Sequence, residues 1–254
     1  DMFGRWPSME FCSPYEALPR IVSIRFPPLR KGGEGTHVFA VKGTSTWRDV
    51  YTDTKLFATI QVLQAFSTVV PILSLLPLPL VQNIVGKGGG ETQLWKKLED
   101  VITFETRGSQ ERIVLTGHSL GGCFSQIVAA RLQLPALVWS SPGIVYSARR
   151  FGLDVESAAH IIVVSPENDV VGRVDKQAGV VQPIVCRGVD GLPGSAATCH
   201  SLVKSACELW RVCGDARGRD FSHTCRPYVS RESLAGLYEG KPLRRPRQRQ
   251  RHQY

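Results

Sequence analysis

The sequence has seven cysteines but no C-x-x-C pair. Zinc sites and thioredoxin-like redox sites are usually built on such pairs, so this absence argues against both. The chain also has no N-x-S/T glycosylation sequon. Its first residues, DMFGRWPSME, lack the charged, apolar and small-residue succession of a signal peptide. A removed leader or an anchor upstream of this segment is left open.

Five cysteines lie in the last third of the chain: Cys186, Cys199, Cys207, Cys213 and Cys225. Cysteines this dense, without metal spacing, indicate disulfides, and therefore a secreted or endomembrane/vacuolar lumenal protein, with membrane association left open. Reduced cytosolic thiols are the alternative. We expect Cys123 to be a small buried residue. The six others, which include Cys12, could form three disulfides in about fifteen ways.

Acidic residues are missing from the end of the chain. Residues 241–254 hold one Lys and five Arg, whereas the whole chain has a net charge of +9. The remaining body is therefore nearly neutral, and no nucleic-acid partner is expected. We predict that residues 241–254 form a basic, disordered tail. Attraction of the tail to an anionic membrane or a polyanion is the alternative.

Charge is also missing from Leu56 to Gly86. This segment is long enough to cross a bilayer. It contains Pro71, Pro77 and Pro79, however, which argue against a regular spanning helix. We predict that residues 56–91 form a mobile, apolar, lid-like insertion hinged at the glycines 88–90. A buried helical layer and a spanning helix are the alternatives.

Short apolar runs alternate with helical patterns along the rest of the chain. Predicted strands are residues 21–26, 37–43, 112–117, 135–141 and 160–169, and predicted helices are residues 92–105 and 122–134. This alternation predicts an α/β fold with a largely parallel sheet flanked by helices. We expect one domain over residues 1–240, followed by the tail 241–254.

Gly117-His118-Ser119-Leu120-Gly121 fits the pattern G-x-S-x-G between a predicted strand and a predicted helix. A strand that turns directly into a helix strains its central residue and holds the hydroxyl clear of the backbone, which is the geometry of a nucleophilic serine. A purely structural tight turn is the alternative. The sequence therefore predicts Ser119 as a nucleophile.

A serine nucleophile needs a base and an acid that orients the base. Asp169 directly follows a buried strand, and His200 lies between a loop and a helix-like run, in the chain order of such folds. We predict Asp169 as the acid and His200 as the base. The rival acids are Asp154, Asp175 and Asp190, and the rival histidines are His223, His252 and His160, which precedes the acid. A turn-capping role is the alternative for Asp169, and a purely structural role for His200.

An oxyanion hole requires two donors. The backbone N–H of Leu120, at the start of the helix, is one candidate. The other is Thr44, which follows a strand and Gly43 and offers both an N–H and a hydroxyl.

The chain resembles the class 3 (fungal-type) lipases in five segments taken together: VFAVKGTSTWRDVYTD, VLTGHSLGG, SPG, NDVV and CH. The resemblance runs from about Val38 to His200, and its SSPG and CH elements are most similar to the autophagic, vacuolar phospholipase branch. The resemblance implies an α/β-hydrolase fold with a lid. It also implies that Thr44 is an oxyanion donor and that Asp53 supports the loop that contains Thr44. Three features depart from the family: Lys42 replaces an arginine, NDVVGRV lacks the proline that often follows the acid, and the cysteine spacing beyond His200 does not match.

The sequence thus predicts a carboxylic ester hydrolase that acts on triacylglycerols or phospholipids at a membrane or lipid-droplet surface. Ser119, Asp169 and His200 would carry the reaction without a metal or an organic cofactor. A catalytically weak or inactive membrane-binding protein of the same fold is the alternative.

Overall fold

The computed structural model describes residues 8–12, 21–28, 31–43, 77–86, 94–188, 191–213 and 225. In this part of the chain, seven strands form one sheet: β1 (Ser8–Cys12), β2 (Ile21–Phe26), β3 (Thr36–Val41), β4 (Arg112–His118), β5 (Ala136–Trp139), β6 (Ile161–Pro166) and β7 (Val180–Ile184). The α-helices are α3 (Leu78–Gly86), α4 (Leu94–Glu105), α5 (Leu120–Leu132), α6 (Ala196–Cys199) and α7 (Leu202–Cys213). The described residues also form the 3₁₀ turns η1 (Ala148–Phe151), η2 (Val155–Ala158) and η3 (Val171–Arg173).

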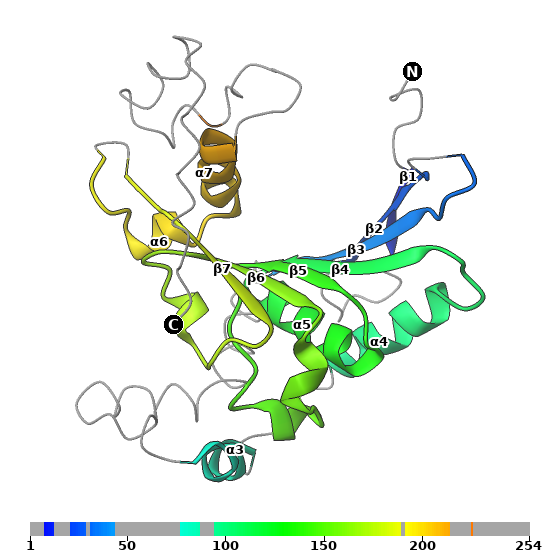
Figure 1. The fold of residues 1–254 in the computed structure, drawn as a ribbon, viewed down its shortest axis with the longest axis horizontal. Coiled ribbons are helices and arrows are strands. Elements are labelled where there is room, and N and C mark those ends of the chain that lie inside the picture. The colour runs from blue at the N-terminus through cyan, green and yellow to red at the C-terminus, as the bar shows by residue number, and fades with distance from the viewer. Residues whose placement is uncertain are drawn as a thin grey trace, which may run out of the picture.

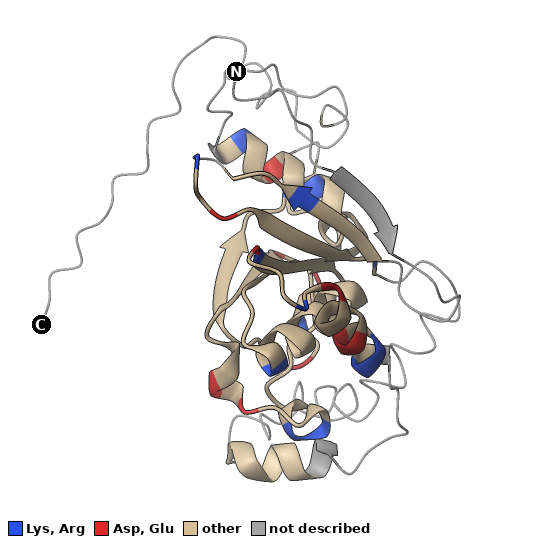
Figure 2. Cartoon of the chain, turned by 90° about the vertical axis from the view of Figure 1, so that its right-hand side faces the viewer, with Lys and Arg blue, Asp and Glu red and all other residues tan. Residues whose placement is uncertain are grey.

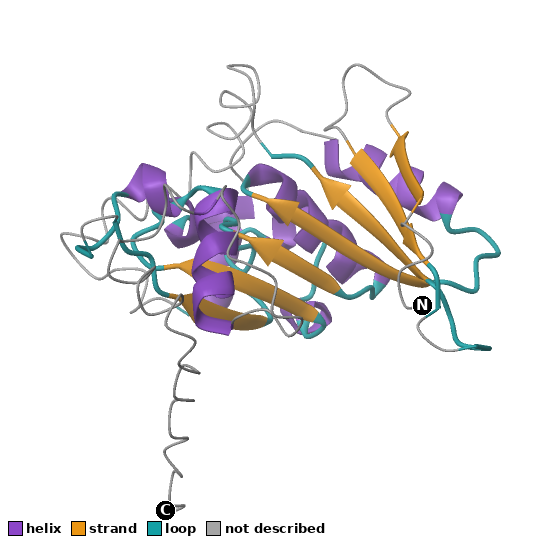
Figure 3. Cartoon of the chain, turned by 90° about the horizontal axis from the view of Figure 1, so that it is seen from above, coloured by secondary structure: helices purple, strands orange, loops and turns teal. Residues whose placement is uncertain are grey.

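The strands lie in the sheet in their chain order (Figure 1). β1 to β3 are antiparallel to one another, whereas β3 to β7 are parallel. Crossovers between parallel strands are almost always right-handed, so a sheet that grows in one direction places its crossover helices on one face. α4 and α5 indeed share a face, and α7 lies on the other, against β7 (Figures 1 and 3).

α5 lies at the centre of the hydrophobic core. Every residue from Leu120 to Ala130 is buried, because the sheet covers one side of α5 and α4 packs on another. α4 contributes Leu98 and Ile102, both fully buried. The strands themselves carry few charged residues (Figure 2), as expected for a sheet that buries apolar side chains. The core thus fixes the start of α5, where the G-x-S-x-G turn lies.

The mostly parallel sheet flanked by helices agrees with the sequence prediction, and five of its strands match predicted ones within a few residues. β1 and β7 were not predicted. β7 is the last strand of the sheet, contains Pro183, and exposes both Val180 and Val181. An edge strand needs no periodic burial and tolerates proline, so its sequence carries little strand signal.

The predicted lid-like insertion 56–91 lies largely outside the described residues, as does the tail 241–254. The part that is described is α3. Val81 is buried on its inner face, and Gln82 donates from Nε2 to the carbonyl of Val145 at 2.9 Å, while Leu80 is 45% exposed. α3 is thus a surface helix anchored along one side. Among the described residues, no helix combines the length and hydropathy needed to cross a bilayer.

Two disulfides occur within the described part of the chain, Cys186–Cys199 and Cys207–Cys225. The expectation of disulfides in the C-terminal third is confirmed to that extent. Cys123 is a buried thiol on α5, as expected. For Cys12 and Cys213 the structure describes the backbone but not the side chains, so the third disulfide stays a prediction.

Candidate active site

Ser119 lies at the turn between β4 and α5 with φ 58° and ψ −129°. A positive φ is costly for a residue with a side chain, and such strain is concentrated at functional sites. The turn closes only because glycines lie two positions before and two positions after Ser119. A Cβ on Gly117 would lie 2.5 Å from the carbonyl carbon of Gly121, and one on Gly121 would lie 2.3 Å from the carbonyl oxygen of Val41.

His200 lies directly over this serine. Its Nε2 is 3.0 Å from Oγ of Ser119, and its Nδ1 is 3.1 Å from each carboxylate oxygen of Asp169. A carboxylate only accepts hydrogen bonds, so Nδ1 carries the proton and Nε2 presents its lone pair to the serine hydroxyl. The structure thus brings together the three side chains that the sequence predicted as nucleophile, base and acid.

The position of His200 is set by a short, cross-linked element. His200 follows α6, which begins after Ser195, a side-chain cap that accepts from the N–H of Thr198 at 3.3 Å. The last residue of α6, Cys199, is bonded to Cys186 in the segment after β7. A Cβ on Gly194 would lie 2.7 Å from Sγ of Cys199, so only glycine fits beneath this disulfide. The disulfide therefore fixes the residue next to the imidazole.

Asp169 follows β6 through a turn in which Asn168 has φ 65°. Its side chain is fully buried and also accepts from the N–H of Val171 at 2.9 Å. Burial alone would raise the pKa of Asp169, but the hydrogen bonds from His200 and Val171 and the charge that His200 can carry hold this pKa below its usual value. The site thus favours the carboxylate over the carboxylic acid.

The rival candidates lie elsewhere or outside the described residues. Asp175 is buried and accepts from the backbone of Tyr146 and Ser147, which fixes the loop after β5. Asp154 caps η2, and His160 is exposed before β6. The remaining rivals, Asp190, His223 and His252, are not among the described residues.

The oxyanion donors are described in part. Leu120 is the first residue of α5, where backbone N–H groups have no partner within the helix. Thr44 and Asp53 lie outside the described residues, but Gly43 is described. A Cβ on Gly43 would lie 2.4 Å from the carbonyl oxygen of His118 and 3.1 Å from Cβ of Ser119. The residue before Thr44 is therefore packed directly against the turn that carries the serine.

His118 is a further member of the cluster that sequence reasoning did not single out. Its Nε2 lies 2.7 Å from the carbonyl oxygen of His200, and the two rings are 4.7 Å apart at their centroids. The motif leaves this position unspecified, so only the fold reveals the contact.

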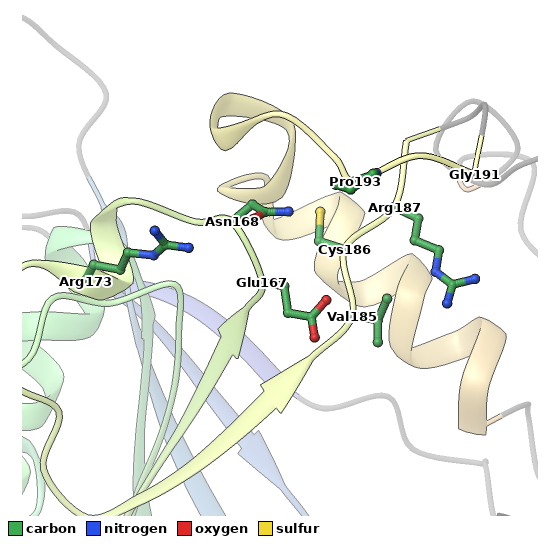
Figure 4. A pocket seen from close by; sticks show the side chains of 8 residues that line it. All are labelled: Glu167, Asn168, Arg173, Val185, Cys186, Arg187, Gly191 and Pro193. Carbon is green, nitrogen blue, oxygen red and sulfur yellow. The ribbon is translucent and has the colours of Figure 1, made fainter.

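A pocket of about 780 Å³ lies beside the acid-bearing loop but contains none of the three clustered side chains. Its lining consists of Glu167, Asn168, Arg173, Val185, Cys186, Arg187, Gly191 and Pro193. Figure 4 shows Arg173 and Arg187 at opposite ends of the pocket with Glu167 between them, so the two cations do not converge on one point. The geometry of Ser119, His200 and Asp169, rather than this pocket, marks the candidate site.

Within the described ranges, no group of three or more His, Cys, Asp or Glu side chains is arranged to hold a metal ion. The hydrogen-bonded serine, histidine and aspartate are the residue types that acyl transfer by side chains uses as nucleophile, base and orienting anion.

No protein-family model and no curated protein matches the chain. Among solved structures, it is similar to M37 lipase, with 14% sequence identity and a TM-score of 0.37. The similarity covers 91% of this chain and 84% of that one. A likeness this weak carries no argument about chemistry, which rests instead on the site geometry.

Proposed function

We propose that this protein is a serine hydrolase that cleaves carboxylic ester bonds of lipids, and that its fold is an α/β-hydrolase fold of the class 3 lipase type. The observation that carries the proposal is the continuous hydrogen-bonded chain from Ser119 through His200 to Asp169, with distances of 3.0 and 3.1 Å. A strained serine at a strand-to-helix turn supports the same assignment.

In the proposed reaction, Oγ of Ser119 attacks the ester carbonyl while Nε2 of His200 takes the hydroxyl proton. The N–H groups of Leu120 and Thr44 stabilise the oxyanion, each contributing about 3 kcal/mol. Collapse of the tetrahedral intermediate breaks the ester bond, and His200 returns the proton to the departing alcohol. Water then attacks the acyl-enzyme with His200 again as base, which releases the fatty acid and restores Ser119.

The lowered pKa of Asp169 supports this sequence of steps. An ionised Asp169 holds the proton of His200 on Nδ1 and stabilises the imidazolium that forms at each proton transfer. Ser119 is only 8% exposed, which favours a site that is closed off from solvent while the protein is in aqueous solution. A covered site and the uncharged segment 56–86 together support a lipid substrate, either triacylglycerol or phospholipid.

The two disulfides support a secreted or lumenal location, because disulfides persist in oxidising compartments. We propose an endomembrane or vacuolar lumen, or the exterior of the cell, where a membrane or lipid droplet would present the substrate.

The proposal is tested by labelling the purified protein with a fluorophosphonate and comparing it with Ser119→Ala. Wild type should be labelled at Ser119, and the alanine variant should not. Ser157→Ala is the matched control, because Ser157 lies on η2 and donates to the carbonyl of Asp154. Equal labelling of Ser119→Ala and wild type would remove Ser119 as the nucleophile.

Hydrolysis of emulsified triacylglycerol and of phosphatidylcholine vesicles, followed by mass spectrometry of the released fatty acids, then separates the two substrate classes.

A further inference from the structure

His118 connects β4, the strand that leads into Ser119, to His200, the residue that would act as base. It is the last residue of β4 and directly precedes Ser119. Its Nε2 lies 2.7 Å from the carbonyl oxygen of His200, a residue 82 positions further along the chain. The two imidazole rings lie 4.7 Å apart with an interplanar angle of 43°.

The direction of this hydrogen bond follows from its partners. A carbonyl oxygen only accepts, so Nε2 of His118 carries a proton and donates it to the carbonyl of His200. Burial lowers the pKa of His118 and a charge on His200 lowers it further, while the bond to the carbonyl and the nearby Asp169 act in the opposite direction. The net lowering favours a neutral ring that donates through Nε2 only.

β4 lies between β3 and β5 in the sheet, and it is hydrogen-bonded on both sides. His200, by contrast, follows a helix of four residues and is half-buried. The bond from His118 therefore ties this short, cross-linked element to a central strand. This hydrogen bond starts at the residue next to Ser119, so it restrains the distance between Ser119 and His200.

We propose that His118 is a positioning residue, which holds the His200 backbone so that the imidazole stays over Ser119 during turnover. This inference rests on the proposed function. Acyl transfer needs the base within hydrogen-bond reach of the hydroxyl, and a displacement of about 1 Å can cost about 100-fold in rate. A neutral His118 also places no second positive charge beside the imidazolium of His200.

The experiment compares two amides that differ by one methylene. In His118→Gln the side-chain N–H₂ reaches the place of the imidazole Nε2, whereas in His118→Asn it falls short. His118→Phe keeps the ring but has no donor. Wild type and variants are compared by the rate of fluorophosphonate labelling and by kcat and KM on a soluble short-chain ester. Circular dichroism melting shows whether each variant is folded.

We expect His118→Asn and His118→Phe to lose about 10- to 100-fold in labelling rate and kcat, with KM changed less than about threefold. His118→Gln should recover most of this loss. His160→Gln, a change at an exposed histidine before β6, is the matched control and should leave both rates unchanged.

Two results would overturn the role of His118: folded Asn and Phe variants that label as fast as wild type, or a folded Gln variant as slow as Asn. A variant that melts early is assayed well below its melting temperature, so the Gln and Asn pair remains decisive. Failure of the proposed function is distinguishable, because the wild-type protein itself would then not be labelled at Ser119.

Discussion

Both carboxylate oxygens of Asp169 lie 3.1 Å from Nδ1 of His200. The two residues are 31 positions apart, and each approaches from a different loop at the carboxyl edge of the sheet, Asp169 after β6 and His200 after β7 and α6. This contact decides which nitrogen of His200 holds the proton, and hence whether Nε2 can accept one from Ser119.

Asp169→Asn should therefore reduce kcat by about 10³- to 10⁴-fold without unfolding the protein. An amide N–H₂ facing Nδ1 favours the other tautomer, in which Nε2 is protonated and cannot act as base. The measurement is kcat on a soluble ester together with the melting temperature. Asp154→Asn is the control, since the side chain of Asp154 accepts from the backbone N–H of Glu156 at the start of η2. Comparable losses in both variants would show that the effect is not specific to the contact with His200.

The same contact predicts a dependence of stability on pH. The pKa of Asp169 is lowered in the folded protein, so the folded state binds a proton less readily than the unfolded chain. Its contribution to the free energy of unfolding is full above the unfolded pKa of about 4 and is lost as the pH falls through the lower folded value.

Urea unfolding of wild type and Asp169→Asn at several pH values between about 7 and 2.5 checks this prediction. Wild type should be the more stable at neutral pH, and the difference should shrink below about pH 4. A difference that stays constant or grows with acid would show that the carboxylate is not favoured by folding.

The three side chains of the candidate site, Ser119, Asp169 and His200, could be selected from sequence because each follows a strand or loop with a clear pattern. Ser119 lies in a glycine-flanked turn, and Asp169 ends a buried apolar run. Since the carboxyl ends of parallel strands meet at one edge of a sheet, chain order alone suggested that these residues would converge.

Other features could not be predicted, because they depend on contacts between distant segments. The bond of His118 to His200 is made by a motif position that any residue type can occupy. The pairing of Cys186 with Cys199 was one of many possible pairings until the fold placed both sulfurs above Gly194. β7 escaped prediction because an exposed edge strand has no apolar alternation.

The Cys186–Cys199 disulfide should support activity as well as stability, because Cys199 is covalently adjacent to His200. The double variant Cys186→Ser/Cys199→Ser should lose about 2–4 kcal/mol of unfolding free energy and, in addition, at least about tenfold in kcat. Urea unfolding and ester turnover measure the two effects separately.

Cys207→Ser/Cys225→Ser is the matched comparison, because that disulfide joins α7 to Cys225 and does not adjoin His200. It should lose a similar amount of stability, with kcat changed less than about threefold. Equal losses of kcat in the two double variants would show that the first disulfide has no special effect on the base.

The last prediction concerns α3, the described part of the predicted lid-like insertion. Leu78 packs against the core and Val81 is buried, so an aspartate at either position would disturb packing, whereas Leu80 is 45% exposed. If the insertion meets a lipid surface, exposed apolar residues on it should gain stability there, at about 25 cal/mol per Å² buried.

We therefore expect wild-type activity to rise steeply when a short-chain ester passes from monomers to micelles. Leu80→Asp should flatten this rise while turnover of the monomeric ester changes less than about twofold, because the charge resists burial in lipid but lies at a position that is 45% exposed in water. Val81→Asp is the comparison: it should lower the melting temperature and reduce turnover of both forms of the ester together, as expected for a buried position. If Leu80→Asp leaves the rise intact, α3 takes no part in lipid contact. A parallel loss on both ester forms with a lower melting temperature would instead make Leu80 part of the packed structure, in agreement with a buried helical layer rather than a lid.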